Sequence, residues 1–207
     1  MNTQEQVNSL IETTTAFIQK TLPECLLSES SEGLLPIVGS TLKHIHFPAG
    51  YTLVLKKEYD TTTELGKTDF LLTSPDGKEY YGDAIAPLLK VDLSADGIWE
   101  YFLFANSKRY LPVEWHGAYL QWKLLLNAKE IDYIPALAKY DQDKFKKNVV
   151  DPEVFFKNGF AFIKYTYWSE WEGLVRETDR LRIVDGSIVD YSYDLKEIVV
   201  HYSCGYV

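Results

Sequence analysis

The start of the chain carries apolar residues at three- and four-residue intervals, whereas most of the rest alternates between apolar and polar positions. Between residues 3 and 22 the apolar positions fall on one side: Val7, Leu10, Phe17 and Ile18. Spacing of this kind predicts an amphipathic helix. We expect this helix to pack its apolar side against a sheet.

Short segments bounded by turn residues predict strands between residues 41 and 105. These segments are residues 42–47, 51–58, 69–73 and 98–104. The turns between them contain Pro, which presets φ, and Gly, which accepts positive φ: Pro48-Ala49-Gly50 and Ser74-Pro75-Asp76-Gly77. The last segment follows an Asp96-Gly97 pair and is rich in aromatic residues, which is typical of strands.

Residues 117–127 are open to two interpretations. Alternate positions from Ala118 to Leu126 are apolar, which indicates a strand, but good helix formers fill the same segment. A short helix and a charged loop are expected between residues 136 and 145.

From Gly159 onward, long alternating segments predict an antiparallel meander. The fold class is therefore α+β: an N-terminal amphipathic helix packed on a curved, mainly antiparallel sheet that ends in a long-stranded meander. No long linker, internal repeat or change of composition divides the chain, so we expect one domain over residues 1–207.

The strongest hairpin signal is Asp185-Gly186, which lies between two apolar and β-branched segments. A two-residue type I′ turn sets the register, and the predicted pairs are Ile183–Ile188, Arg182–Val189, Arg180–Tyr191 and Thr178–Tyr193. Because side chains alternate between the faces of a strand, this register gathers arginines and tyrosines on one face. Acids, among them Glu177 and Asp179, lie on the other.

The face of arginines and tyrosines is the candidate binding site, because guanidinium groups bind carboxylates or phosphates and stack on aromatic rings. Aromatic residues are concentrated here, since 12 of the 30 lie in residues 155–207. The candidate set includes two tryptophans before the hairpin: Arg176, Arg180, Arg182, Tyr191, Tyr193, Trp168 and Trp171. The structural alternative is that arginine side chains cover the tyrosine rings and pair with acids on neighbouring strands.

Charge and composition narrow the kinds of partner. The 30 acidic and 21 basic residues give a net charge of −9, which repels phosphate backbones and favours encounter with a basic protein. We therefore expect no nucleic acid partner. The apolar runs are too short for a membrane span, and the first residues lack a secretory pattern, so we expect a soluble, cytoplasmic protein.

Two sets of residues that contain histidine are candidates for a chemical site. His44 and His46 share one face of a strand at the spacing of a cupin-like metal site, but no acid follows at the required distance. Cys204 and His201 are three residues apart on a strand, so they point to opposite faces and cannot act as a nucleophile–base pair. We predict no bound metal.

The sequence contains no other recognisable catalytic motif. Glu170 and Glu172 have the spacing of an acid/base pair, but two acids beside tryptophans are also typical of a solvated corner. No nucleophile elbow, dinucleotide fingerprint, P-loop or zinc knuckle occurs. We therefore expect no cofactor and favour a non-catalytic protein.

Two functions remain. The first is a binding protein that neutralises or escorts a basic partner, and its acidic composition is similar to that of bacterial toxin-immunity proteins. The second is a small-molecule pocket protein or enzyme. A leading helix, a long antiparallel meander and a DG hairpin near the end are similar to the NTF2-like fold, and this resemblance implies a cavity between helix and sheet, lined by Arg and Tyr of the hairpin.

Overall fold

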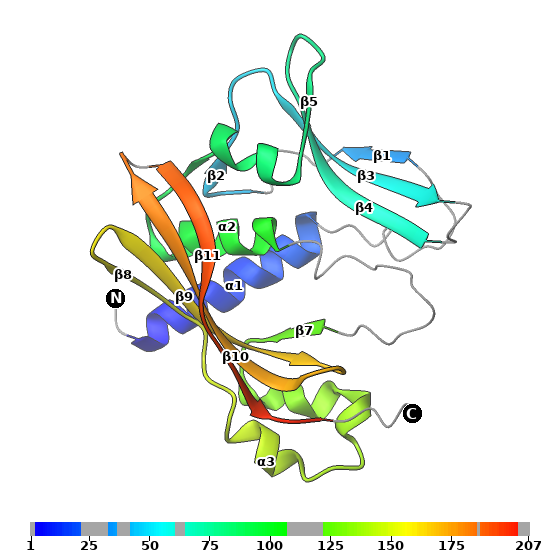
Figure 1. Cartoon of the computed structure of the whole chain (residues 1–207), viewed down its shortest axis with the longest axis vertical. Coiled ribbons are helices and arrows are strands. Elements are labelled where there is room, and N and C mark those ends of the chain that lie inside the picture. Colours follow the sequence, from blue (N-terminus) through cyan, green and yellow to red (C-terminus); the bar gives the residue numbers. More distant parts are fainter. Residues whose placement is uncertain are drawn as a thin grey trace.

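Helix α1 opens the fold and spans Thr3–Thr21, so the helix predicted for residues 3–22 is confirmed. The computed structural model describes residues 3–21, 33–36, 42–60, 65–106, 122–185 and 187–202. These residues form a mixed α+β fold with antiparallel sheets and a C-terminal meander of long strands (Figure 1). The predicted fold class is therefore confirmed.

Helix α1 is held in place by its apolar side and by polar contacts with α2 and β8. Val7, Leu10 and Phe17 are buried, as the periodicity predicts, while the side chain of Ile18 lies outside the described ones. Thr14 Oγ1 accepts a hydrogen bond of 2.7 Å from the indole of Trp99 on helix α2 (Ala95–Ala105). The first turns of α1 also reach strand β8 (Glu153–Lys157) through a side chain hydrogen bond.

Helix α2 corrects the strand predicted for residues 98–104. Ser94 caps the helix by accepting a hydrogen bond from Gly97 N, and every residue from Gly97 to Phe104 is buried. A helix that is buried on all sides has no polar face, so its sequence lacks the 3.6-residue period. The aromatic run therefore has strand-like composition although it is helical.

Three antiparallel sheets account for the described strands. Four strands form the first sheet, in the order β1 (Gly33–Pro36), β3 (Thr52–Asp60), β4 (Leu65–Thr73) and β5 (Glu79–Tyr81). The second sheet is a pair, β2 (Ile45–His46) and β6 (Lys90–Val91). Between β5 and β6 lie two short 3-10 helices, η3 (Gly82–Ala84) and η4 (Ala86–Leu88). The predicted turn at residues 74–77 is confirmed, with Gly77 at φ +84°.

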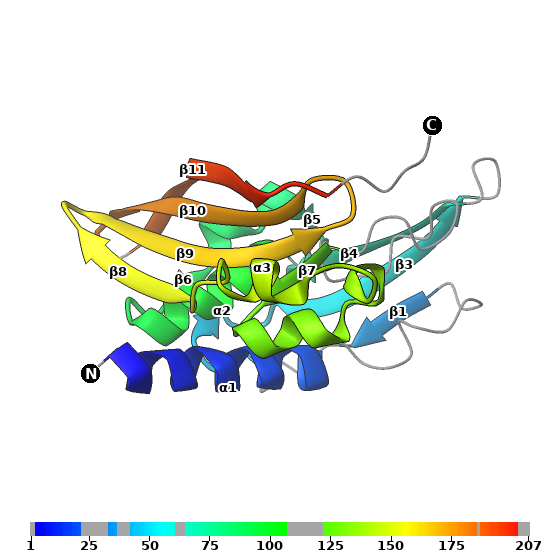
Figure 2. The same cartoon turned by 90° about the horizontal axis from the view of Figure 1, so that it is seen from below.

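The C-terminal sheet carries the long strands of the predicted meander. Its order is β11 (Ser187–Val200), β10 (Gly173–Val184), β9 (Phe160–Ser169) and β7 (Trp122–Leu125), and β8 pairs with β9 beside β7. Strand β7 decides residues 122–125 in favour of the strand interpretation, while residues 117–121 lie outside the described residues. Figure 2 shows the curvature of β9 and β10, with α2 between them and α1.

The two faces of the C-terminal sheet are covered differently. The inner face lies against α2 and contributes Ile163, Tyr165 and Tyr167 to a core that also includes Leu55 and Phe70 of the first sheet. One end of the outer face is covered by η6 (Ala128–Tyr133), η7 (Pro135–Leu137) and α3 (Gln142–Lys146). Among the described helices, none combines the length and apolar character that a membrane crossing requires.

Candidate functional site

The hairpin of β10 and β11 begins with the register that the sequence predicts. Ile183 faces Ile188 and Val184 faces Ser187, and Asp185 has a positive φ of 49° at the turn. A β-bulge follows at once, between Ile183 and Arg182, and a second lies between Asp179 and Thr178. Each bulge adds one residue to β11 and shifts every later pair.

The predicted pairs beyond the first bulge are therefore wrong. Arg180 faces Ser192 rather than Tyr191, which lies opposite Leu181 instead. Tyr193 correspondingly faces Asp179 rather than Thr178. Because a shift of one residue moves a side chain to the other face, the hairpin arginines and tyrosines do not share a face.

The three arginines lie on the outer face, where they contact residues of neighbouring segments. Arg180 lies over the ring of Phe160 at 5.1 Å and forms a 3.9 Å ion pair with Asp194 of β11. Arg182 is exposed and is the register neighbour of the acid Asp190. These contacts follow the structural alternative, in which arginines cover aromatic rings and pair with acids across strands.

Arg176 has a different partner on the same outer face. Its Nε donates a 2.9 Å hydrogen bond to the main-chain carbonyl of Asn148, and its Nη2 lies 3.4 Å from the side-chain oxygen of the same residue. Asn148 follows α3, so Arg176 ties this covering segment to the sheet. The binding role predicted for the arginines is a hypothesis that these contacts do not test.

The two candidate tryptophans have opposite environments. Trp168 is fully buried on the outer face between Phe145 and Tyr202, and its ring lies 5.8 and 4.8 Å from theirs. Trp171 lies in the turn between β9 and β10 and is 56% exposed. Trp171 is therefore a surface side chain, whereas Trp168 is part of the core.

The inner face carries a buried polar network, of which the binding prediction included only Tyr191. Glu177 and Asp179 are almost completely buried, and both point toward Tyr165 of β9. The Tyr165 hydroxyl donates a 2.8 Å hydrogen bond to Glu177 Oε1 and lies 3.3 Å from Asp179 Oδ2. Tyr191 donates to the same Asp179 oxygen and accepts a 2.6 Å hydrogen bond from Asn106 at the end of α2.

The tyrosines of this region act as hydrogen-bond donors because they hold their protons. Burial raises the pKa of Tyr165 far above its ordinary value, and the carboxylates of Asp179 and Glu177 raise it further. Burial, with a smaller contribution from Asp83, raises the pKa of Tyr101 to about 12. Both hydroxyls are therefore neutral at physiological pH. The hydrogen bonds of the network connect the end of α2 with β9, β10 and β11.

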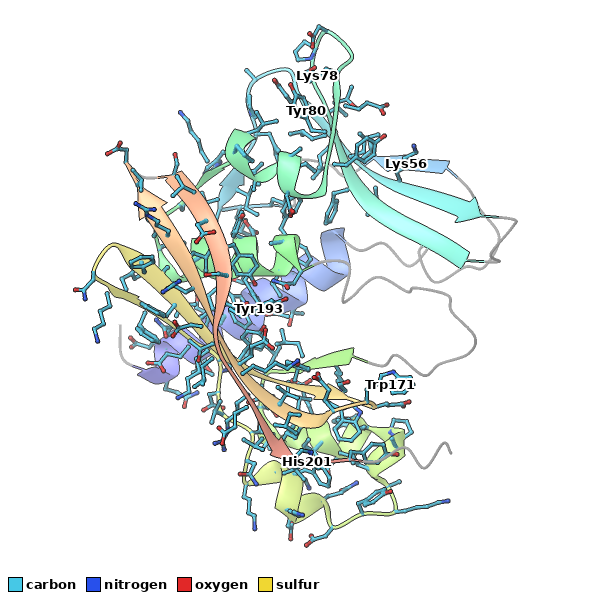
Figure 3. The ribbon with its side chains drawn as sticks, viewed as in Figure 1. Lys56, Lys78, Tyr80, Trp171, Tyr193 and His201 are labelled. Carbon is cyan, nitrogen blue, oxygen red and sulfur yellow. The ribbon has the colours of Figure 1, made fainter. Side chains whose placement is uncertain are left out.

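The open margin of the inner face is a mixed aromatic and charged surface, which we call the β11 rim: Trp171, Glu172, Tyr193, Lys196 and Ile198. Lys196 Nζ donates a 2.7 Å hydrogen bond to Glu172 Oε1, and Tyr167 donates to the other carboxylate oxygen at 3.0 Å. Tyr193 is 63% exposed. Figure 3 shows Tyr193 near the centre of the molecule and Trp171 beside the β9–β10 turn.

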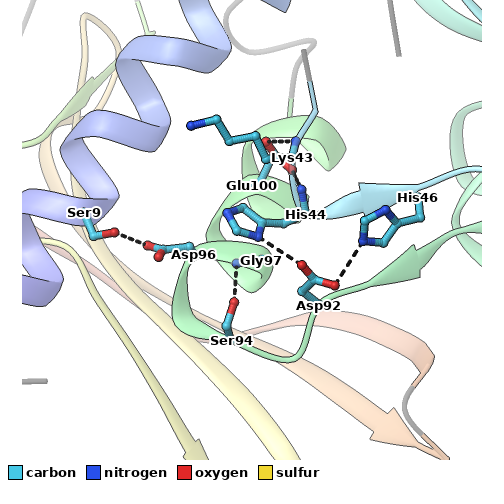
Figure 4. Close-up of polar contacts among 9 residues, drawn as sticks. All are labelled: Ser9, Lys43, His44, His46, Asp92, Ser94, Asp96, Gly97 and Glu100. Carbon is cyan, nitrogen blue, oxygen red and sulfur yellow. Dashed lines mark hydrogen bonds and ion pairs between the residues drawn. The ribbon is translucent and has the colours of Figure 1, made fainter. Parts of the chain in front are cut away.

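The two histidines of the first half share a carboxylate that comes from another element. His44 Nδ1 and His46 Nε2 lie 3.1 and 3.0 Å from the two oxygens of Asp92, which follows β6 (Figure 4). Hydrogen bonds from His44 and His46 lower the pKa of Asp92 below its usual value. Within the part of the chain that the structure describes, no three His, Cys, Asp or Glu side chains are arranged to hold a metal ion.

Behind the histidine pair, the buried carboxylate of Glu100 anchors α2 to the chain before β2. It accepts hydrogen bonds of 3.0 and 2.7 Å from the main-chain N–H groups of Lys43 and His44 (Figure 4). This contact and the Asp92 contacts hold the β2–β6 pair against the start of α2. The arrangement is a structural clamp.

Glu170 and Glu172, which have the spacing of an acid/base pair, lie in different environments. Burial raises the pKa of Glu170, whereas Glu172 is held by Lys196 and Tyr167.

The side chains of the buried polar network on the inner face could be predicted from the sequence only in part. Glu177 and Asp179 alternate with the arginines and lie between Val175 and Leu181, a spacing that marks the acids as members of an apolar, inward face.

Comparison with protein-family models, with curated proteins and with solved structures found no match to this chain.

Proposed function

We propose that this protein is a non-catalytic binding protein that neutralises or escorts a basic protein partner, and that the β11 rim is its contact surface. The observation that carries the proposal is the exposure of two large aromatic side chains of the rim, Trp171 at 56% and Tyr193 at 63%. Tyrosine and tryptophan dominate the binding energy of protein interfaces because they bury large areas with few rotatable bonds.

The charge of the molecule supports a basic partner. The net charge of −9 raises the rate of encounter with a basic surface. The buried network beneath Tyr193 supports the same proposal in a second way. Tyr165 and Tyr191 fix the strands that present the rim, so a partner meets a surface that is already ordered.

The pocket alternative required Arg and Tyr of the hairpin to line one cavity. The register places Arg180 on the outer face and Tyr191 on the inner face, so the two cannot line a cavity together. The observation that motivated this alternative is therefore missing, and we favour the binding function.

Photo-crosslinking tests the proposed contact surface. A benzoylphenylalanine placed at Tyr193 or Trp171 in the native host should form a covalent adduct with a basic protein, identified by mass spectrometry. Tyr133 is 74% exposed on the outer side and is the matched control position. Adducts at position 133 that equal those at position 193, or none at position 193, would contradict the proposal. Alanine at both positions 171 and 193 should weaken binding of the partner by roughly 2 kcal/mol or more.

A further inference from the structure

The carboxylate of Glu172 is held by two groups of different kinds. Glu172 lies in the turn between β9 and β10, directly after Trp171 (Figure 3). Its Oε2 accepts a 3.0 Å hydrogen bond from the hydroxyl of Tyr167, whose ring is buried in the main core. Its Oε1 accepts a 2.7 Å hydrogen bond from Lys196 of β11, whose side chain is 44% exposed. One bond therefore comes from the packed interior and the other from a side chain at the surface.

The ammonium group of Lys196 marks a place that suits a cation. Its Nζ lies 6.0 Å from the centre of the Tyr167 ring as well as 2.7 Å from the carboxylate. A carboxylate beside an aromatic ring attracts ammonium and guanidinium groups through its charge and through the ring quadrupole. The side chain of Glu172 is 33% exposed, so a cation from outside the chain can approach it. We call this place, the carboxylate of Glu172 with the ring and hydroxyl of Tyr167, the Glu172 cation site.

The Glu172 cation site keeps its shape without Lys196. Gly173, the next residue of the turn, has a positive φ of 95°, and a Cβ there would lie 2.1 Å from the main-chain oxygen of Val200. The turn therefore packs tightly against the end of β11, at a distance that only glycine allows. Together with the Tyr167 hydroxyl, this packing holds the carboxylate in position. A site that is already ordered binds a ligand with a smaller loss of conformational entropy.

Arginine is a better occupant of this site than lysine. A guanidinium group presents parallel N–H donors to the two oxygens of a carboxylate, and an oxygen that already accepts one hydrogen bond has a second lone pair. Lysine carries a compact charge on a flexible chain and lacks this two-point geometry. The ion pair of Lys196 is partly exposed, and exposed pairs contribute little to stability, so its displacement costs little.

We propose that an arginine side chain of the basic partner displaces Lys196 and binds the carboxylate of Glu172 beside the ring of Tyr167. This inference rests on the proposed binding function and names the group that the β11 rim recognises. Lys196 is then an internal competitor, which occupies the site in the free protein and lowers its affinity for the partner. The exchange keeps a cation at Glu172 before and after binding, so the carboxylate stays neutralised in the complex.

Nuclear magnetic resonance with a single amino-acid probe tests the site without the partner. The probe is Nα-acetylarginine methylamide, whose only charge is the guanidinium group. The signal is the side-chain carboxyl carbon of Glu172, assigned by its loss in Glu172→Gln. In Lys196→Met the probe should shift this signal saturably, with half-saturation at a concentration at least threefold lower than in the natural protein. Nα-acetylnorleucine methylamide should cause no shift, and Lys196→Gln should give the same gain as Lys196→Met.

Lys123→Met is the matched control for the lost charge. Lys123 Nζ lies 3.8 Å from Glu130 Oε2 and 5.9 Å from the centre of the Tyr133 ring, so the same three kinds of side chain meet on the outer face. This variant removes a positive charge from a similar setting and leaves Glu172 and Lys196 unchanged. It should alter the half-saturation at Glu172 by less than twofold.

Four results would overturn the arginine site. They are a Glu172 signal that the arginine probe does not shift in either Lys196 variant, an equal shift by the norleucine probe, the same half-saturation in the natural protein and both Lys196 variants, and an equal gain in Lys123→Met and Lys196→Met. The last result would show that the gain comes from net charge alone.

Photo-crosslinking at position 193 separates this inference from the binding function. Adducts with the basic protein should increase at least threefold in Lys196→Met and fall at least threefold in Glu172→Gln. If adducts form with the same yield in both variants, the binding function stands and the arginine site is wrong. If the probe binds at Glu172 as described but no adducts form at positions 193 and 171, the arginine site is right and the proposed binding function is wrong.

Discussion

At the scale of single residues, Gly97 lies so close to the main chain of Asp92 that glycine is preferred there although a helix otherwise favours alanine. Alanine favours a helix interior over glycine by roughly 0.5–1 kcal/mol. A Cβ at Gly97 would lie 2.1 Å from the main-chain oxygen of Asp92, whose side chain contacts His44 and His46. We predict that Gly97→Ala destabilises the protein by about 1–3 kcal/mol, measured by urea denaturation.

The matched control for this change is Asn8→Ala, on the exposed side of α1. This substitution should change the free energy of unfolding by no more than about 0.5 kcal/mol. A Gly97→Ala variant that is as stable as the natural protein, or more so, would show that the Asp92 main chain moves aside without cost.

For single residues, the sequence predicts the direction of a side chain but not its partner. The inward direction of Glu177 and Asp179 follows from their two-residue spacing with Val175 and Leu181. Their partners, Tyr165 and Tyr191, come from strands 12 and more residues away and are brought together only by the folded sheet. The same is true of Asp92, which meets two histidines 46 and 48 residues before it.

At the scale of elements, we predict that packing of α1 against the core contributes strongly to the stability of the fold. Phe17 is 1% exposed and belongs to the main core. Phe17→Ala should therefore lower the free energy of unfolding by about 3–5 kcal/mol, the range for a buried large aromatic residue. Chemical denaturation followed by circular dichroism measures this loss.

The control for α1 is Thr15→Ala, whose exposed hydroxyl bonds only within the helix. It should have a small effect, because Thr15 is exposed and surface substitutions usually change the free energy of unfolding by no more than about 0.5 kcal/mol. If Phe17→Ala unfolds at the same denaturant concentration as Thr15→Ala, the core packing of α1 contributes little to stability.

Elements whose sequence period is strong were predictable, and those whose environment is uniform were not. Helix α1 has one buried side and one exposed side, and β10 alternates between buried and partly buried positions, so their patterns agree with their structures. Helix α2 is buried all round, and its pattern carries no period. The β10–β11 turn was recognised from Asp185-Gly186, but the bulges beyond it have no local signal, and they place Tyr191 and Tyr193 on the face opposite to the arginines.

At the scale of the whole molecule, the first sheet and the C-terminal sheet share one core. Buried residues from β3, β4, α2 and β9 form a single cluster, which places Leu55, Phe102 and Ile163 in the same apolar interior. Phe102 contacts Tyr165, and Phe104 stacks on Phe70 at 4.6 Å, so α2 bridges the two sheets. The single domain expected from the sequence is therefore a prediction with a physical basis, and cooperativity tests it.

Leu55 provides that test because it is fully buried in β3, distant in sequence from β9. Leu55→Ala should lower the free energy of unfolding by about 2–5 kcal/mol. In a single cooperative unit, the slowest-exchanging amides of β9 must lose the same free energy as those of β3, since both exchange only through global unfolding. Thr52→Ala, an exposed change in the same strand, is the control and should leave both sets of amides unaltered. Loss of protection in β3 and β4 while β9 keeps its natural exchange rate would show that the two sheets unfold separately.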